Sequence, residues 1–347
     1  MRRHHTPISI ILIFLVLIVV MGLSCPITSP ADPGGDTQLS SGPSETPEAT
    51  PEPTPEPTPE PTPEPTPEPT PEPTVPAMSE IPFIYSPSAF VFDCRSDTFI
   101  YTQGNPDEKL YIASVTKLFT AYVALQYLDP DATITVGKIL ETVPSDSSTA
   151  NLSLRDQMTV KDFIYAMLLP SGNDAARVVA VEVGKIIAGT SNQPETTYMS
   201  LFVEEMNTQA ELLGLTGTHF VTPDGYHDPE HYSSLRDMAA IGKLCLETPL
   251  IMEVAGTDVH RGTLLNNGKE LLWINGNRLL HEKRYDPSYY NAAALGLKTG
   301  YTSHAGHCLL SAFAVDGGYV LIGIFGNGDS PSRYTDTLKL FNAITYK

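Results

Sequence analysis

Residues 292–325 read AAALGLKTGYTSHAGHCLLSAFAVDGGYVLIGIF and contain three strand-like runs in succession. The runs cover Ala292–Thr299, His307–Val315 and Tyr319–Phe325. An Asp-Gly-Gly sequence at 316–318 separates the last two runs, and glycine readily adopts the positive φ angles of tight hairpin turns. The stretch therefore predicts strands joined by short connections, which pair in an antiparallel manner.

Two further strand-like runs, Ala89–Asp93 and Thr98–Tyr101, lie earlier in the chain with turn residues between them. Helical patterning fills the middle and closes the sequence, at Ser114–Leu128, Val160–Leu169, Asp174–Ile187, Thr196–Leu213, Ser234–Leu246 and about Ser332–Ile344. We therefore expect an α+β architecture, in which a five-stranded, mainly antiparallel sheet is flanked by helices and carries a helical subdomain.

The N-terminus predicts export. A short basic segment, Met1–Pro7, precedes the apolar run Ile8–Leu23, which is the pattern of a signal segment. The sequence Gly-Leu-Ser-Cys at 22–25 resembles a bacterial lipobox, so residues 1–25 are either a signal peptide with a lipidated Cys25 or an uncleaved membrane anchor. Both alternatives predict an extracytoplasmic protein tethered to the membrane, and simple cleavage with release is the third alternative.

Residues 26–78 are predicted to be a spacer. Of the 31 prolines in the chain, 18 lie between Pro26 and Pro76, and the sequence Thr-Pro-Glu-Pro repeats from Thr50 to Thr74. Proline lacks the backbone N–H that helices and sheets need, so this segment favours an extended polyproline conformation. At about 3.1 Å per residue it reaches on the order of 150 Å. The folded domain is then expected at residues 79–347.

Charge and cysteine content exclude several classes of protein. The net charge of −19 argues against a nucleic-acid partner, because such proteins need a basic surface to neutralise phosphates. The cysteines show no pairing pattern of a disulfide framework or a zinc site. His227 with His231 and His304 with His307 have ligand-like spacing, but the chain has no H-E-x-x-H motif. We expect no metal and no other cofactor.

Three short motifs point to serine chemistry. Ser114 and Lys117 form an S-x-x-K sequence, and residues three apart on a helix share one face. A serine hydroxyl is a weak nucleophile that needs an adjacent base, and Lys117 is within reach to serve as one. The alternative is a helix cap beside a solvated lysine, but apolar neighbours surround the pair.

The other two motifs are weaker alone. Ser171 and Asn173 form an S-x-N sequence, in which Ser171 would relay a proton and Asn173 hold a substrate amide; ordinary helix capping is the alternative. Lys298, Thr299 and Gly300 form a K-T-G sequence at a predicted strand end. There a strand edge pairs with an extended peptide, Gly300 admits a ligand close to the backbone, and Lys298 attracts a carboxylate; a plain turn is the alternative.

Together, S-x-x-K, S-x-N and K-T-G form a set for serine acyl-enzyme chemistry. Over Ile81–Asn327 the chain resembles the D-alanyl-D-alanine carboxypeptidase family of low-molecular-mass penicillin-binding proteins. The resemblance rests on the motifs and on the runs SGNDAA (171–176), LGLTGTHFVTPDG (213–225), HYSSLRDMA (231–239), NGNRLL (275–280) and GLKTGYTSHAG (296–306).

The resemblance implies a β-lactamase/transpeptidase-like fold and a site between sheet and helical subdomain. By position in the motifs it implies that Ser114 is acylated, Lys117 is its base, Ser171 and Asn173 act as the second motif, and Lys298 with Thr299 binds substrate. The backbone N–H groups of Ser114 and Tyr301 would form the oxyanion hole, and Arg333 would pair with a carboxylate. The implied substrate is a peptidoglycan stem peptide ending in D-Ala-D-Ala, with β-lactams as covalent inhibitors and a role in cell wall biogenesis.

The lysine base sets a physical requirement and leaves alternatives. Lys117 must be neutral to accept a proton, so we expect burial and the second cation Lys298 to lower its pKa. One alternative function is a β-lactamase, although no E-x-x-x-N sequence lies between Ser171 and Lys298. Another is a catalytically silent wall-binding module of the same fold. An amine acceptor in place of water would give transpeptidation.

Overall fold

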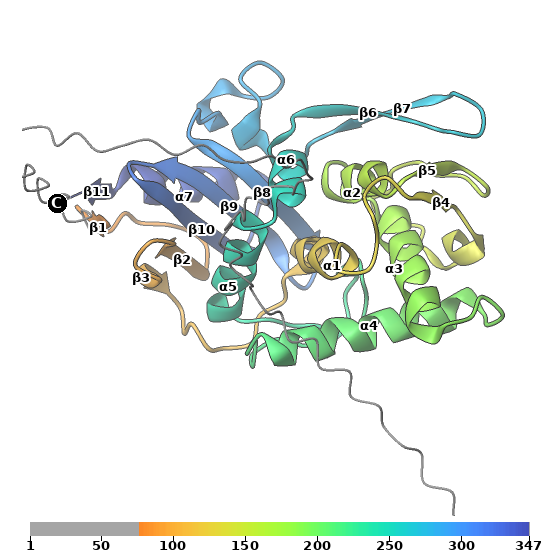
Figure 1. The fold of residues 1–347 in the computed structure, drawn as a ribbon. Coiled ribbons are helices and arrows are strands. Elements are labelled where there is room, and N and C mark those ends of the chain that lie inside the picture. Colours follow the sequence, from red (N-terminus) through yellow and green to blue (C-terminus); the bar gives the residue numbers. More distant parts are fainter. Residues whose placement is uncertain (1–75, 347) are drawn as a thin grey trace, which may run out of the picture. The chain divides into compact units, whose positions relative to one another are not determined.

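The computed structural model describes residues 76–346, which are built around a five-stranded sheet (Figure 1). The strand order is β3-β2-β10-β9-β8, and each neighbouring pair is antiparallel. The strands are β2 (Ser88–Asp93), β3 (Thr98–Gln103), β8 (Ala294–Thr302), β9 (Gly306–Val315) and β10 (Gly318–Asn327). The predicted α+β fold is therefore confirmed, including the hairpin at 316–317.

Helices cover both faces of this sheet (Figure 1). Successive residues of a strand point to opposite faces, so Phe90 and Phe92 join one apolar core while Ala89 and Val91 join the other. The first core includes buried side chains of the helical subdomain, and the second includes Tyr334 of the C-terminal helix. The helices are α1 (Thr116–Ala124), α2 (Val160–Leu168), α3 (Asn173–Ala188), α4 (Glu195–Leu212), α5 (Leu235–Leu246), α6 (Pro249–Gly256) and α7 (Ser330–Asn342).

Several short elements are not predicted by the sequence patterns. They are the hairpin β6 (Val259–Thr263) and β7 (Glu270–Ile274), the pair β4 (Thr133–Thr135) and β5 (Gln157–Thr159), helix α6, and the 3-10 turns η1 (Ala113–Val115), η2 (Lys138–Thr142), η3 (Arg278–Leu280) and η4 (Pro287–Tyr289). The predicted helix over 114–128 is also corrected at both ends. Ala113 has a φ of +48°, which a regular helix does not allow, so Ser114 lies in η1 and α1 starts at Thr116.

The predicted boundary between spacer and domain is wrong by a few residues. Residues 76–78, assigned to the spacer, form strand β1 (Pro76–Met78), which pairs antiparallel with β11 (Ile344–Tyr346). Because β1 pairs with β11, the folded domain includes residues 76–78, which precede the expected start at residue 79. The predicted signal or anchor at 1–25, and the spacer up to residue 75, lie outside the described residues. Between 76 and 346, no helix is long and apolar enough to span a membrane.

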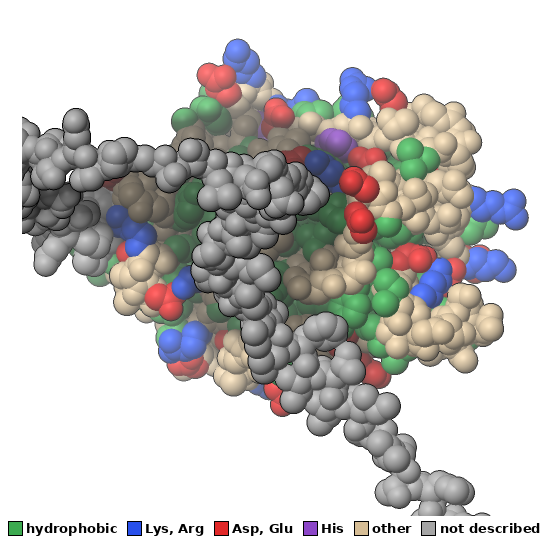
Figure 2. Space-filling view, viewed as in Figure 1, with side chains coloured by type: hydrophobic (Ala, Val, Ile, Leu, Met, Phe, Trp, Pro, Cys, Tyr) green, Lys and Arg blue, Asp and Glu red, His purple; other side chains and the backbone are tan. Residues whose placement is uncertain are grey.

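Charged side chains lie at the surface in mixed order. On the face shown in Figure 2, Lys and Arg side chains are interspersed with Asp and Glu. Exposed ion pairs account for part of this pattern, among them Arg236 with Asp107 and Lys161 with Glu253. Such exposed pairs contribute little to stability, because water screens them.

Candidate active site

A cleft of about 460 Å³ lies where the predicted motifs meet. The motif residues that line it are Ser114, Ser171, Asn173, Thr299, Gly300, Tyr301 and Arg333. Lys117 and Lys298 do not line it; they are 0% and 1% exposed. The structure thus brings seven of the nine predicted residues to the surface of one cleft and buries the two lysines.

The turn that carries Ser114 is held in an unusual conformation from two sides. Ala113 has a positive φ, and the carbonyl of Ala113 would lie 2.0 Å from a Cβ at Gly225. A Cβ at Gly300 would lie 2.9 Å from the Ile112 carbonyl and 3.1 Å from the Ser114 nitrogen. The sequence predicts that Gly300 admits a ligand, and the structure shows that it also makes room for the backbone of the turn around Ser114. A backbone strained in this way is typical of functional sites.

Lys117 makes three hydrogen bonds through its Nζ atom. The partners are Ser114 Oγ at 2.8 Å, Asn173 Oδ1 at 2.7 Å and the backbone carbonyl of Asp224 at 2.6 Å. Ser114 Oγ also lies 3.4 Å from the same carbonyl. The predicted contact between Ser114 and Lys117 is present, and Asn173 contacts the lysine.

The environment of Lys117 favours its neutral form. Burial lowers its pKa to about 8, Asp224 and Asp174 oppose the shift, and Arg177 adds to it. The sequence suggests Lys298 as the neighbouring cation. Lys117 and Lys298 do act on each other in the structure, and Arg177 is a further cation, which lies on α3 and pairs with Asp224 beside Lys117.

The second motif connects a loop to the start of α3. Ser171 has a φ of +65°, and Asn173 is the first residue of α3. While Asn173 Oδ1 accepts from Lys117, its Nδ2 donates to Ser147 Oγ at 3.0 Å. The next residue, Asp174, accepts from the backbone N–H of Ala150 at 2.8 Å. The motif therefore fixes the loop around 147–150, which forms one wall of the cleft.

The third motif lies on β8, the terminal strand of the sheet. Lys298 Nζ donates to the carbonyl of Thr299 at 2.9 Å, and burial, Lys117 and Arg333 hold its pKa well below the ordinary value. Arg333 on α7 donates to the carbonyls of Gly300 and Cys308 at 3.2 and 3.3 Å. Arg333 therefore places a guanidinium at the cleft beside Gly300, whereas the lowered pKa of the buried Lys298 favours its neutral form.

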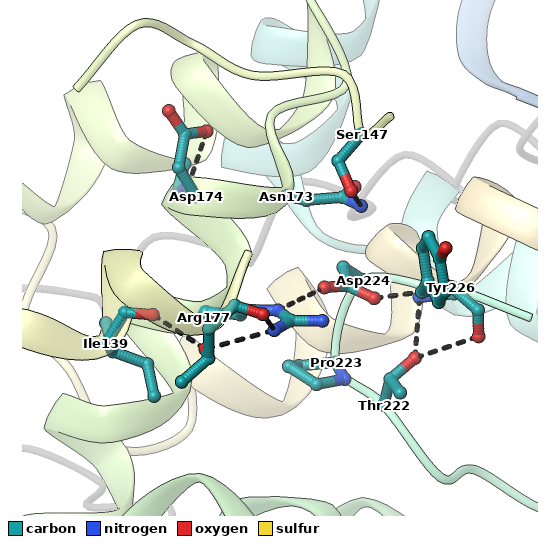
Figure 3. A network of polar contacts seen from close by, with 12 residues as sticks. Ile139, Ser147, Asn173, Asp174, Arg177, Thr222, Pro223, Asp224 and Tyr226 are labelled. Atoms are coloured by element: carbon teal, nitrogen blue, oxygen red, sulfur yellow. Dashed lines mark hydrogen bonds and ion pairs between the residues drawn. The ribbon is translucent and has the colours of Figure 1, made fainter. Parts of the chain in front are cut away.

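The structure also reveals residues that the motifs do not identify. Arg177 Nε donates to Asp224 Oδ2 at 2.6 Å, and the backbone N–H of Tyr226 donates to Asp224 Oδ1 at 2.8 Å (Figure 3). Asp224 lies in the run at 213–225, which carries part of the family resemblance but assigns this residue no role. Its partner Arg177 directly follows the run SGNDAA.

The histidines of the predicted pairs take different positions. His231 is buried and hydrogen-bonds to Thr116, whereas His227 stacks on His304 at the cleft with ring centroids 3.7 Å apart. Within the described part of the chain, no group of three or more His, Cys, Asp or Glu side chains is arranged to hold a metal ion. His231 acts as a hydrogen-bonding group of the core.

A serine bonded to a buried lysine, between an antiparallel sheet and a helical subdomain, defines the fold class of transpeptidases and penicillin-binding proteins. The solved structures agree. The match with the Streptomyces K15 DD-transpeptidase covers 76% of this chain and 97% of the transpeptidase chain, with a TM-score of 0.66 and 28% sequence identity. The match with penicillin-binding protein D2 of Listeria monocytogenes, in its ampicillin-bound form, covers 75% of this chain and 98% of the Listeria chain, with a TM-score of 0.60 and 25% sequence identity.

The chain belongs to the D-alanyl-D-alanine carboxypeptidase family, whose profile matches residues 76–329. The D-alanyl-D-alanine carboxypeptidase of Streptomyces sp. (strain K15) is 30% identical over an alignment of 270 residues, and the alignment covers 75% of this chain and 87% of that protein. The carboxypeptidase DacD of Escherichia coli is 32% identical over 74% of this chain. The match spans only 62% of DacD, so the resemblance to that relative is partial.

Proposed function

We propose that this protein is a serine-type D-Ala-D-Ala carboxypeptidase, which removes the terminal D-alanine from peptidoglycan stem pentapeptides. The observation that carries the proposal is the contact of Ser114 Oγ with a buried lysine amine at the cleft. Family membership supplies the reaction class and supports the choice of substrate. β-Lactams are the expected covalent inhibitors, since a relative of the same fold is known in an ampicillin-bound form.

In the proposed mechanism, neutral Lys117 takes the proton of Ser114 as Oγ attacks the carbonyl carbon between the two D-alanines. A lysine with a pKa of about 8 is neutral in roughly a tenth of the molecules at pH 7, compared with less than about a thousandth at the ordinary value. Burial of Lys117 therefore supplies a usable base at neutral pH.

The remaining steps use the other motif residues. The oxyanion of the tetrahedral intermediate is stabilised by the N–H groups of Ser114 and Tyr301, and such donors typically contribute about 10²–10³ in rate. The substrate lies along the edge of β8, with its terminal carboxylate near Thr299 and the basic side chains of Lys298 and Arg333. The departing D-alanine amine gains its proton through Ser171, and water then cleaves the acyl-enzyme ester.

The first prediction concerns the nucleophile. Ser114→Ala removes the atom that forms the acyl bond, so we expect no covalent labelling by a fluorescent penicillin. Ser200→Ala, which changes an exposed serine on α4, should be labelled like the wild type. Labelling is read on a denaturing gel after a time course. Persistent labelling of Ser114→Ala would contradict the assignment.

Product analysis tests the reaction itself. With a muramyl pentapeptide as substrate, mass spectrometry should show the loss of one alanine, and only with Ser114 present. Adding an amine acceptor separates hydrolysis from transpeptidation, the activity named for the Streptomyces structure. Rapid turnover of nitrocefin would favour a β-lactamase instead, and labelling without any alanine release would favour a binding module.

We further propose that the protein is extracytoplasmic and tethered to the membrane by its N-terminus. A basic segment before the apolar run 8–23, followed by Cys25 and a Pro-rich stretch, supports this proposal. The second prediction follows: Cys25→Ser should release the protein from the membrane fraction if Cys25 is lipidated, and should leave it there if the apolar run is an uncleaved anchor. Recovery of wild-type protein mainly in the soluble extracellular fraction would contradict tethering.

A further inference from the structure

A buried ion pair lies directly behind the proposed base. The side chains of Arg177 and Asp224 are 7% and 0% exposed and meet at 2.6 Å. The backbone carbonyl of the same Asp224 accepts the hydrogen bond from Lys117 Nζ. Asp224 therefore contacts Arg177 through its side chain (Figure 3) and Lys117 through its backbone carbonyl.

The hydrogen-bond partners of Lys117 Nζ define the direction of the lone pair of the neutral amine. A neutral amine has two N–H donors and one lone pair. Asn173 Oδ1 and the Asp224 carbonyl accept two hydrogen bonds from Nζ, and the remaining direction faces Ser114 Oγ at 2.8 Å. Displacing the Asp224 carbonyl would turn the lone pair away from the serine hydroxyl.

The carbonyl of Asp224 is held in place from its own side chain. The carboxylate accepts from Arg177 Nε on one oxygen and from the Tyr226 N–H on the other. Arg177 in turn donates through Nη1 to the carbonyl and the hydroxyl of Thr142, which ends the turn η2. Gly225 follows with a φ of +76°, and its N–H donates to Thr222 Oγ1 at 3.1 Å. The ion pair thus anchors the loop 222–226 to α3.

The two charges of the pair act on Lys117 in opposite directions. Asp224 raises the pKa of Lys117 and Arg177 lowers it, so the pair as a whole disturbs the amine less than either charge alone. The other charged or titratable groups around the lysine are Asp174 from α3, Lys298 from β8 and the buried His231. Removing one member of the pair would leave a buried charge without its partner beside the amine.

We propose that Arg177 and Asp224 form a neutral positioning pair, which aims the Lys117 amine at Ser114 and sets the pH range in which that amine acts as the base. The proposal rests on the proposed roles of Ser114 and Lys117. Neither Arg177 nor the Asp224 side chain touches the reacting atoms, so both are positioning residues.

The test measures the second-order rate constant of acylation by a fluorescent penicillin between about pH 5.5 and pH 10, a range that extends about two pH units to either side of the lowered pKa of Lys117, which is about 8. In the wild type the rate should rise with pH and level off above the pKa of Lys117. Arg177→Met leaves the carboxylate unpaired and should move this rise to higher pH by about one pH unit, which makes acylation roughly tenfold slower at pH 7. Asp224→Asn leaves the guanidinium and should move the rise to lower pH by about one pH unit.

Three controls separate this effect from a loss of structure. Arg177→Lys keeps the charge but loses the forked geometry, so the rise should stay near the wild-type pH while the plateau falls. The double variant Arg177→Met/Asp224→Asn removes both charges and should return the rise to within about 0.3 of the wild-type pH value. Arg236→Met breaks an exposed Arg–Asp pair on α5 and should change neither quantity.

Opposite displacements of the rise in the two single variants would support the pair as a positioning device. Displacements in the same direction, or lower plateaus with the rise at the wild-type pH, would overturn the proposal, because a purely structural role predicts that outcome. If a single variant does not fold, the double variant decides, and a rise that lies about one pH unit or more from the wild-type position would overturn the proposal. Failure of the proposed function has a different signature: labelling of the wild type that persists in Ser114→Ala.

Discussion

His231 illustrates how a single buried residue supports the site without taking part in the chemistry. Its Nδ1 accepts from the backbone N–H groups of Val221 and Thr222 at 3.1 and 3.3 Å. Nε2 must then carry the proton, which it donates to Thr116 Oγ1 at 2.8 Å, and Thr116 donates to the carbonyl of Ala113 at 2.7 Å. A neutral imidazole thus stabilises the strained residue that precedes Ser114.

This arrangement predicts a pH dependence of stability. Burial lowers the pKa of His231 to about 4. The unfolded chain, with a pKa near 6.5, binds a proton first, so the contribution of His231 is complete above about pH 6.5 and decreases as pH falls towards about 4. The expected loss is about 3 kcal/mol across that window. Urea denaturation at about pH 7.5, 6 and 5, on either side of the unfolded-state pKa, measures it.

The matching variant is His231→Gln, which does not titrate. It should be less stable than the wild type at about pH 7.5, and the difference should shrink towards about pH 5. Other groups titrate in both proteins and cancel in the comparison. A difference that stays constant with pH would show that His231 has the same pKa in the folded and the unfolded chain, which contradicts the prediction.

Among the site residues, those in the short motifs were predicted from the sequence, whereas the Asp224 carbonyl and the side-chain partner Arg177 were not. The contact of Ser114 with Lys117 follows from their spacing of three along the chain. The contribution of Asp224 comes from its carbonyl, a group that every residue has, and its partner Arg177 lies 47 positions away. No local pattern marks such a pair, because the fold alone brings it together.

At the scale of elements, the same distinction holds. The five sheet strands and the α-helices other than α6 carry their periodicity in the sequence, and each of these was predicted within a few residues. The three-residue strands β1 and β11 have too few residues to show a hydrophobic period. They pair with each other although they lie at opposite ends of the domain sequence, as in the register of Pro76 with Tyr346. Hairpin β6–β7 begins with Val-His-Arg-Gly-Thr, which has little apolar alternation.

The turn η1 carries Ser114, and its 3-10 geometry is not indicated by its sequence. Residues 113–115 read Ala-Ser-Val and directly precede α1, and the sequence pattern predicts that a regular helix begins at Ser114. The positive φ of Ala113 is imposed by packing against β8 and the loop at Gly225. Tertiary contacts therefore set the backbone conformation of the residue before Ser114, the proposed nucleophile, whose hydroxyl must be held in place in the proposed mechanism.

At the scale of the whole molecule, one buried carboxylate joins the beginning and the end of the domain. Asp336 on α7 is 0% exposed, and its Oδ2 accepts from the backbone N–H groups of Tyr85 and Ser86 at 2.9 and 3.0 Å. The same oxygen accepts from Ser86 Oγ at 2.8 Å and from Asn327 Nδ2 at 3.0 Å. The segment leading into β2, the end of β10 and α7 therefore converge on this side chain.

The last prediction tests this junction by graded removal. Asp336→Ala leaves several buried donors without an acceptor, and each such group costs roughly 1–3 kcal/mol, so we expect a loss of about 4 kcal/mol in the free energy of unfolding. Asp336→Asn keeps one acceptor oxygen and should lose about half as much. Asp107→Ala, at an exposed carboxylate paired with Arg236, should lose less than about 1 kcal/mol. Guanidinium denaturation gives the three values. If Asp336→Ala is no less stable than Asp107→Ala, the two ends of the domain are held by apolar packing of α7 on the sheet, and the carboxylate is dispensable.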